Sequence, residues 1–135
     1  MVATLSLTFD ELDHQTASMT LPDQSAYHNH VGGPHAGAMF TLAESASGAL
    51  VLANFGDRLG DATPLAVEAT IRYLKLAMGP VTATARMMRS GEEILGELDR
   101  GGRPEFLVEI DLTSSDGTVT GQMTIVWTLK PNKRS

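Results

Sequence analysis

Cysteine is absent from the 135 residues of this chain. Its absence excludes disulfide bonds, a thiolate nucleophile and cysteine-based metal sites. Basic residues are scarce as well: 10 Lys and Arg stand against 16 Asp and Glu, which gives a formal net charge of -6 at pH 7. A nucleic-acid-binding protein is expected to carry a basic patch, so this class is disfavoured.

The first ten residues, MVATLSLTFD, lack the basic segment and the apolar segment that make up a signal peptide. The apolar run around Glu44 is interrupted by threonine, serine and glycine, so we do not expect a membrane span. The length of the chain and its 42% hydrophobic content fit one globular core. We therefore expect a cytoplasmic protein in which residues 1–135 form a single domain.

A long helix is predicted from His35 or Ala36 to about Asn54, after a glycine-rich turn. Its residues are apolar on every side except for one carboxylate, Glu44, and a helix that is hydrophobic all round is a buried helix. No Lys or Arg precedes Arg58, so the local sequence offers Glu44 no cationic partner. Because burying an unpaired carboxylate is costly, we expect Glu44 to be buried for a chemical purpose.

Alternation of apolar and polar residues predicts five strands around this helix. They cover His14–Leu21, Val67–Tyr73, Val81–Met87, Phe106–Leu112 and Val119–Leu129. The second and third strands are separated by Gly79 and Pro80 and are expected to form a hairpin. Residues 90–104 break the alternation, and a short exposed helix followed by a loop is expected there, with an extended hairpin as the alternative.

One long helix inserted after the first strand of a five-stranded antiparallel sheet is the α+β plan of the hotdog fold, in which the sheet wraps around the helix. The segment HAGAMFTLAE, from His35 to Glu44, resembles the His-Gly-Gly, apolar run, Asp or Glu motif of the acyl-CoA thioesterases of the phenylacetate-degradation (PaaI-like) type. Asn29 falls at the Asn or Gln position that precedes this histidine. The segments IRYLKLAMGPVTATARM and SSDGTVTGQMTIVW are similar to later strands of the family. The sequence departs from the family at Ala36, which replaces a glycine, and at residues 90–104, which form a longer link.

The chemistry of Glu44 can be argued from the residue alone. A desolvated carboxylate is a stronger base, and it could deprotonate water or attack a thioester directly. The alternative is a partly buried glutamate that is satisfied by a backbone amide or by a partner subunit.

The start of the helix, at His35, Ala36 and Gly37, suits a developing oxyanion because a helix N-terminus presents backbone N–H groups. The resemblance implies that the Ala36 amide takes this role. Asn29 could hold the attacking water or the substrate carbonyl, or could only form a turn. His35 could order the loop or have a purely structural role.

Five cations are candidates for binding the phosphates of CoA, with a solvated sheet face as the alternative. They are Arg58, Arg72, Lys75, Arg86 and Arg89. A metal site built from His28, His30, His35 and Glu44 is disfavoured because the spacing matches no standard zinc motif. Ser45 and Ser47 lack the surroundings of a serine nucleophile and are expected to pack the helix.

These features predict hydrolysis of an acyl-CoA or related acyl thioester, without a cofactor or a metal. The resemblance implies a homodimer or a tetramer in which Glu44 of one chain approaches Asn29, His35 and Ala36 of its neighbour. Three alternatives stay open: a hotdog dehydratase, whose loop HFPxxPxxPG is not found here, a module that binds acyl thioesters without hydrolysing them, and a structural assembly unit.

Overall fold

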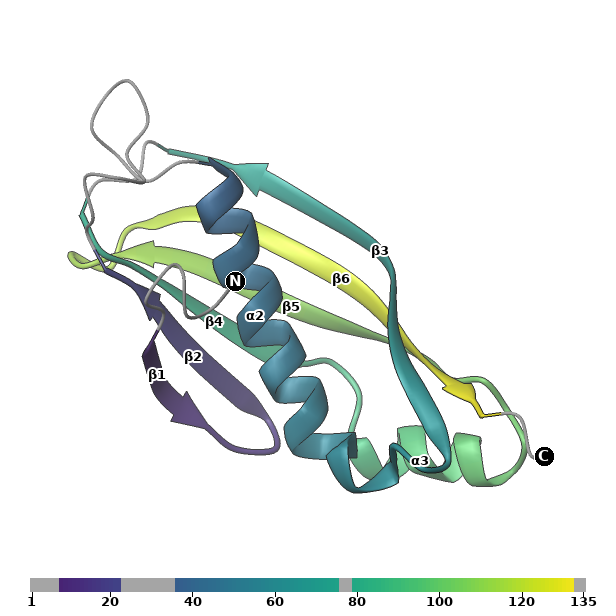
Figure 1. The fold of residues 1–135 in the computed structure, drawn as a ribbon. Coiled ribbons are helices and arrows are strands. Elements are labelled where there is room, and N and C mark those ends of the chain that lie inside the picture. Colours follow the sequence, from purple (N-terminus) through teal and green to yellow (C-terminus); the bar gives the residue numbers. More distant parts are fainter. Residues whose placement is uncertain (1–7, 23–35, 76–78, 133–135) are drawn as a thin grey trace.

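The computed structural model describes residues 8–22, 36–75 and 79–132, which form a curved sheet with a long helix lying on it (Figure 1). In chain order the elements are β1 (Thr8–Leu12), β2 (Thr16–Leu21), α2 (Ala36–Phe55), the short 3-10 helix η2 (Gly56–Arg58), β3 (Ala62–Tyr73), β4 (Val81–Met87), α3 (Gly91–Asp99), β5 (Glu105–Ser114) and β6 (Val119–Pro131).

The sheet has the strand order β1-β2-β4-β5-β6-β3, and each pair of neighbours is antiparallel. The α+β architecture with one central helix, predicted from the sequence, is confirmed. The sheet contains the five predicted strands together with β1, a short edge strand that pairs with β2. β1 was not predicted from the sequence.

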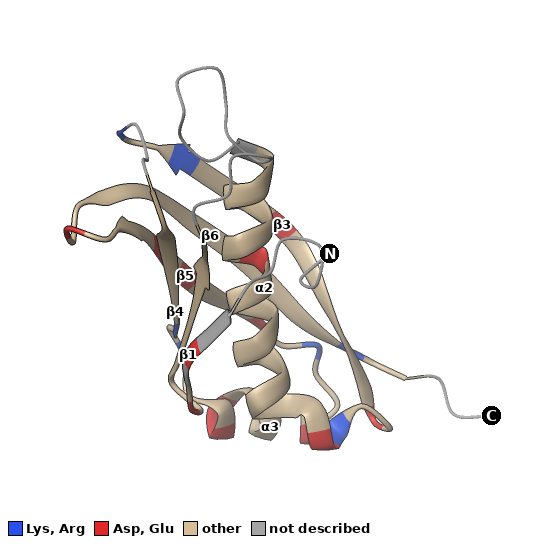
Figure 2. Cartoon of the chain, turned by 60° about the vertical axis from the view of Figure 1, so that its left-hand side comes forward, with Lys and Arg blue, Asp and Glu red and all other residues tan. Residues whose placement is uncertain are grey.

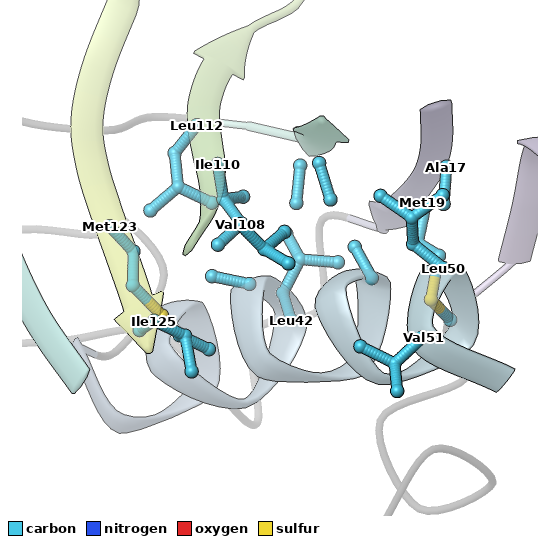
Figure 3. Packing of buried hydrophobic residues seen from close by; sticks show 14 of the residues in the cluster. Ala17, Met19, Leu42, Leu50, Val51, Val108, Ile110, Leu112, Met123 and Ile125 are labelled. Carbon is cyan, nitrogen blue, oxygen red and sulfur yellow. The ribbon is translucent and has the colours of Figure 1, made fainter. Parts of the chain in front are cut away.

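The core lies between α2 and the inner face of the sheet (Figure 3). Alternate residues of the strands point to this face because side chains alternate along a strand. In β5, for example, Val108, Ile110 and Leu112 are buried, and in β6 Met123 and Ile125 face the same way. Leu42 and Leu50 of α2 pack against them.

The predicted hairpin of the second and third strands is wrong. β3 pairs with β6 at one edge of the sheet, whereas β4 lies between β2 and β5. Both edges of β4 are therefore occupied, so the chain between β3 and β4 crosses from the edge of the sheet to its middle. Gly79, at a φ of 74°, belongs to this crossover rather than to a tight hairpin turn.

Residues 90–104 contain the predicted short helix, α3. Ser90 caps it, since its Oγ accepts a hydrogen bond from the Glu93 N–H. Ile94 and Leu98 are buried and hold α3 against the body of the protein. The capped start and the two buried residues explain why a helix forms here instead of an extended hairpin.

By length and composition alone, one helix, Gly37–Arg58, could cross a membrane, and half of its most apolar window is buried inside the fold. Its contacts with β2, β4 and β5 make it the core helix of the sheet. It covers β3 very little, and most residues of β3 are exposed. The inner side of β3 and one side of α2 are therefore left uncovered in the single chain.

Candidate active site

Glu44 lies in the middle of α2 and is the only charged residue of that helix, visible as the red segment in Figure 2. It is exposed in the chain, so the expectation that Glu44 is buried is wrong. The reason is that α2 packs against the sheet on one side only. Leu42, Ala43 and Ala46 face the core, whereas Glu44 belongs to the side that the sheet does not cover.

The uncovered side of α2 has no charged residue other than this carboxylate, and its partly exposed neighbours include Thr41 and Ser45. Leu52 is 54% exposed, two turns beyond Glu44 on the same side of the helix. Gly48 lies between them, and an added Cβ there would meet no atom of the described residues within 4 Å apart from its own helix. An apolar helix therefore need not be buried by its own chain, because another surface can cover the second side.

The start of α2 is too far from Glu44 for both to act on one carbonyl within a single chain. Ala36 is the first residue of the helix, and Glu44 lies about two turns further on, a separation of about 12 Å along the axis. In the predicted reaction, the thioester carbonyl accepts a hydrogen bond from the Ala36 amide and is attacked by Glu44 or by a water that Glu44 deprotonates. Each of the two groups must then lie within about 3 Å of the atom on which it acts. The two groups could converge only if they come from different chains.

Several predicted residues have no described geometry. Asn29 and His35 lie outside the described residues, as do His28 and His30 of the metal alternative. Of the two remaining motif residues at the helix start, the backbone of Ala36 begins α2, and the carbonyl of the exposed Gly37 accepts a hydrogen bond from Thr41 Oγ1 at 3.0 Å.

Ser47 and Trp127 form a contact next to Glu44 that was not predicted from the sequence. Trp127 lies on β6 and donates a hydrogen bond from its indole Nε1 to Ser47 Oγ at 2.7 Å. Ser47 is fully buried, as expected for a serine that packs the helix. The only sequence signal of this contact is that Trp127 shares the inward alternation of Met123 and Ile125.

Three of the five candidate cations are held by carboxylates. Arg58 bridges Asp61 and Asp99, and the hydrogen bonds that its guanidinium donates to these two carboxylates, that to Asp99 first, raise the pKa of Arg58 above its usual value. The side chain of Arg58 thereby connects η2 to α3, which is a structural role.

Arg86 and Arg89 each form ion pairs with carboxylates, at the opposite end of the fold from the start of α2. Arg86 contacts Asp111 at 3.0 Å and Glu109 at 3.8 Å. Arg89 contacts Glu97 at 3.2 Å and Glu93 at 3.9 Å. Both arginines line a cavity of about 600 Å³ that also includes Asn54, near the C-terminal end of α2.

Arg72 and Lys75 lie at or just after the end of β3, which is next to the start of α2 in both cartoon views (Figures 1 and 2). Arg72 is exposed and has no ion-pair partner among the residues that the structure describes. Lys75 lies within electrostatic range of Asp116. Of the five cations, Arg72 is therefore the one most available to a ligand.

Comparison with known families gives one match, which covers residues 1–129, to the domain of unknown function DUF4442. No curated protein matches the chain. Several solved structures are similar over nearly its whole length. A Pseudomonas aeruginosa protein of unknown function, named a probable thioesterase, is 28% identical with a TM-score of 0.86, over 97% of this chain and 87% of that one.

Two further structures share the fold at lower identity. A mutant thioesterase from Pseudomonas aeruginosa is 23% identical, with a TM-score of 0.77 over 97% of this chain and 86% of its own. The PaaI protein of the Escherichia coli phenylacetic acid degradation operon is 15% identical, with a TM-score of 0.74 over 99% and 85%. These neighbours confirm the hotdog fold and the resemblance to PaaI-like proteins.

Proposed function

Because the chain belongs to the DUF4442 family and its structural neighbours include hotdog proteins named thioesterases, we propose that it hydrolyses acyl-CoA or related acyl thioesters. The observation that carries this proposal is the single carboxylate of α2. Glu44 ends the motif HAGAMFTLAE and lies exposed on the uncovered side of the core helix. A solitary carboxylate on an otherwise uncharged helix surface suits a base that acts on an acyl thioester.

In the proposed mechanism Glu44 acts as a general base or as the nucleophile. As a base, it takes a proton from water, whose oxygen attacks the thioester carbonyl, and the C–S bond then breaks with return of the proton to the thiolate. As a nucleophile, its carboxylate displaces the thiolate and forms an anhydride, which water then hydrolyses. The backbone N–H of Ala36 stabilises the oxyanion in either route.

Asn29 and His35 keep the roles that the resemblance implies. Asn29 holds the water or the carbonyl, and His35 orders the loop at the helix start. We also propose that a cation binds the phosphates of CoA. Arg72 is the favoured residue because it lacks a carboxylate partner in the described part of the chain, unlike Arg86 and Arg89.

We further propose that the enzyme is a cytoplasmic homodimer, or a tetramer made of two dimers, with each site shared between two chains. The separation of about 12 Å between Ala36 and Glu44 within one chain supports this arrangement. The free edge of β3 supports it too, since an exposed edge strand of 12 residues is a ready surface for pairing with a second copy. Pairing of this kind would also cover the apolar side of α2.

The direct test of the function is release of thiol from a panel of acyl-CoAs that includes hexanoyl-CoA, dodecanoyl-CoA and benzoyl-CoA. We expect hydrolysis by the parent protein and a loss of roughly 10² to 10⁴ in kcat for Glu44→Gln, the usual worth of a positioned acid or base. Glu92→Gln, a matched change at an exposed glutamate of α3, should leave the rate unchanged. Equal rates for Glu44→Gln and the parent would remove Glu44 from the mechanism.

The same panel distinguishes the other classes of function. An acyl-CoA that raises the melting temperature without releasing thiol would identify a binding module. Neither binding nor release would identify a structural unit.

A further inference from the structure

Trp127 is the only tryptophan of the chain, and it is fixed beside the helical turn that carries Glu44. Its Nε1–H donates to Ser47 Oγ at 2.7 Å. Residues three apart on a helix are neighbours on its surface, so Ser47 lies next to Glu44 on α2, with Ser47 buried towards the sheet and Glu44 exposed on the uncovered side. Because Ser47 is fully buried, its hydroxyl is a rigid anchor for the indole.

Trp127 also lies at the border between the covered and the uncovered parts of the sheet. Its partner on β5, Phe106, is buried. Its partner on β3, Ala66, is exposed. The half-buried indole therefore packs on the core with one part and borders the uncovered surface with the other.

Strand β3, which pairs with β6, has an irregular register opposite Trp127. The register between β3 and β6 shifts between Ala66 and Glu68, opposite Trp127 and Val126. This shift leaves Val67, which is 52% exposed, as the extra residue. Such bulges bend a strand, re-aim side chains and are frequent next to active sites, and β3 bends along its length in Figure 1.

Gly48 adds space on the other side of Glu44. An interior glycine weakens a helix relative to alanine, yet no described atom other than those of its chain neighbours and of the surrounding helix backbone lies within 4 Å of the position that its Cβ would take. The packing of the described residues therefore does not require a glycine here. Gly48 leaves the helix backbone open one turn beyond the carboxylate.

We propose that Trp127, held by Ser47, forms the wall of the acyl-binding surface beside Glu44 and selects the acyl group. This inference rests on the proposed thioesterase function. A large, fixed indole limits the width available next to the reacting carbonyl, whereas Gly48 leaves room for a narrow chain that runs along α2 towards Leu52. The preferred substrates are thioesters of unbranched aliphatic acids, and acyl groups that carry a ring next to the carbonyl are disfavoured.

The first test compares kcat/KM for hexanoyl-CoA with kcat/KM for benzoyl-CoA. The parent should favour hexanoyl-CoA, and Trp127→Phe and Ser47→Ala should each lower this preference by about tenfold or more, the scale on which apolar pockets discriminate. The matched control is Met87→Ala on β4, another half-buried residue packed on the same core, which should leave the ratio unchanged. A parent that prefers benzoyl-CoA, or an unchanged ratio in both variants, would overturn the inference while leaving the thioesterase function intact.

The second test does not need turnover. Since Trp127 is the only tryptophan, its fluorescence can be titrated with hexyl-CoA, a thioether that cannot be hydrolysed, with free CoA as the control. We expect a saturable change with hexyl-CoA that exceeds any change with CoA and is reduced in Ser47→Ala. If the parent hydrolyses no acyl-CoA, the proposed function fails, but this change would still place Trp127 at an acyl-binding surface. Equal responses to hexyl-CoA and CoA would overturn the inference.

Discussion

Arg72 and Arg86 are both arginines of the sheet, but they differ in their partners. Arg86 is engaged by Asp111 and Glu109, whereas Arg72 has no ion pair in the described residues. If Arg72 binds a CoA phosphate, Arg72→Gln should raise KM for acyl-CoA by up to about fivefold, which corresponds to the free energy of one solvent-exposed ion pair. Since this contact is the same in the ground and transition states, kcat should not change.

Arg86→Gln is the comparison in that experiment, and steady-state kinetics at low and high salt is the measurement. We expect its KM to equal that of the parent, because its charge is already neutralised by carboxylates. The increase for Arg72→Gln should shrink at high salt, where exposed charges are screened. Unchanged KM in both variants would assign these arginines to the solvated face of the sheet.

For single residues, the sequence predicted that a functional carboxylate, Glu44, lies in the middle of the central helix, but it did not predict that this side chain is exposed. Composition and periodicity show that a helix is apolar on two sides, but they do not show whether its own chain covers both. The same limit applies to Trp127, whose alternation with its neighbours only indicates that it faces inward. Its hydrogen bond to Ser47 joins residues 80 positions apart, and no local pattern reveals such a contact.

Among the elements, α2 combines a buried side with an open side, and Gly48 lies towards the open one. Gly48→Ala should stabilise the helix by up to about 1 kcal/mol, which corresponds to a rise in melting temperature of roughly 2–8 °C for a small domain. It should also lower kcat/KM for hexanoyl-CoA if the acyl chain passes this residue. Thermal unfolding and thiol release measure the two effects.

Gly96→Ala in α3 is a matched glycine change away from Glu44, where the new methyl meets only the flexible Arg100 side chain at 3.3 Å. It should leave the rate unchanged. A raised melting temperature with an unchanged rate for Gly48→Ala would show that the substrate does not use the open space at this glycine.

The end of α2 and the start of α3 are coupled by Asn54 and Gly91. The Asn54 amide donates to the carbonyls of His14 and Leu50, at 2.8 and 2.9 Å, and its oxygen lies 2.8 Å from the place of a Cβ at Gly91. We therefore expect Gly91→Ala to displace Asn54 and break these hydrogen bonds, at about 1 kcal/mol each. In an Asn54→Ala background the same change should cost much less.

A double-mutant cycle of denaturant unfolding measures this coupling. We expect an interaction free energy of about 1–2 kcal/mol, because both single variants lose the same hydrogen bonds. Additive effects of the two changes would mean that α3 can shift away from α2 without disturbing Asn54.

The elements themselves were predicted with uneven success, for physical reasons. β5 and β6 follow from their strong alternation of apolar and polar residues, because each strand buries one regular face. α2 follows from its long apolar run after a glycine-rich turn. The pairing of β3 with β4 was predicted wrongly because a glycine and a proline between two strands are equally compatible with a hairpin and with a crossover. Strand order depends on which edges are already occupied, and that information is not local.

For the whole molecule, the proposed active site requires a second copy of the chain. β3 presents a free edge, with Leu65 39% and Val67 52% exposed, and α2 presents Glu44 and Leu52 on its uncovered side. Two-fold pairing is the commonest way to cover such surfaces. The pairing would bring Glu44 of one chain towards Ala36 of the other. Within one chain these two residues are about 12 Å apart along the axis of α2, too far to act on one carbonyl.

The most direct test of this central claim is the activity of mixed dimers of Glu44→Gln and Ala36→Pro chains, purified by two different tags after co-expression. Proline is tolerated at the first position of a helix but has no N–H to donate to an oxyanion, so each variant alone should be nearly inactive. A mixed dimer keeps one intact shared site, so it should recover about half of the parental activity per dimer. Mixed dimers that stay as inactive as the two single variants would contradict the shared site.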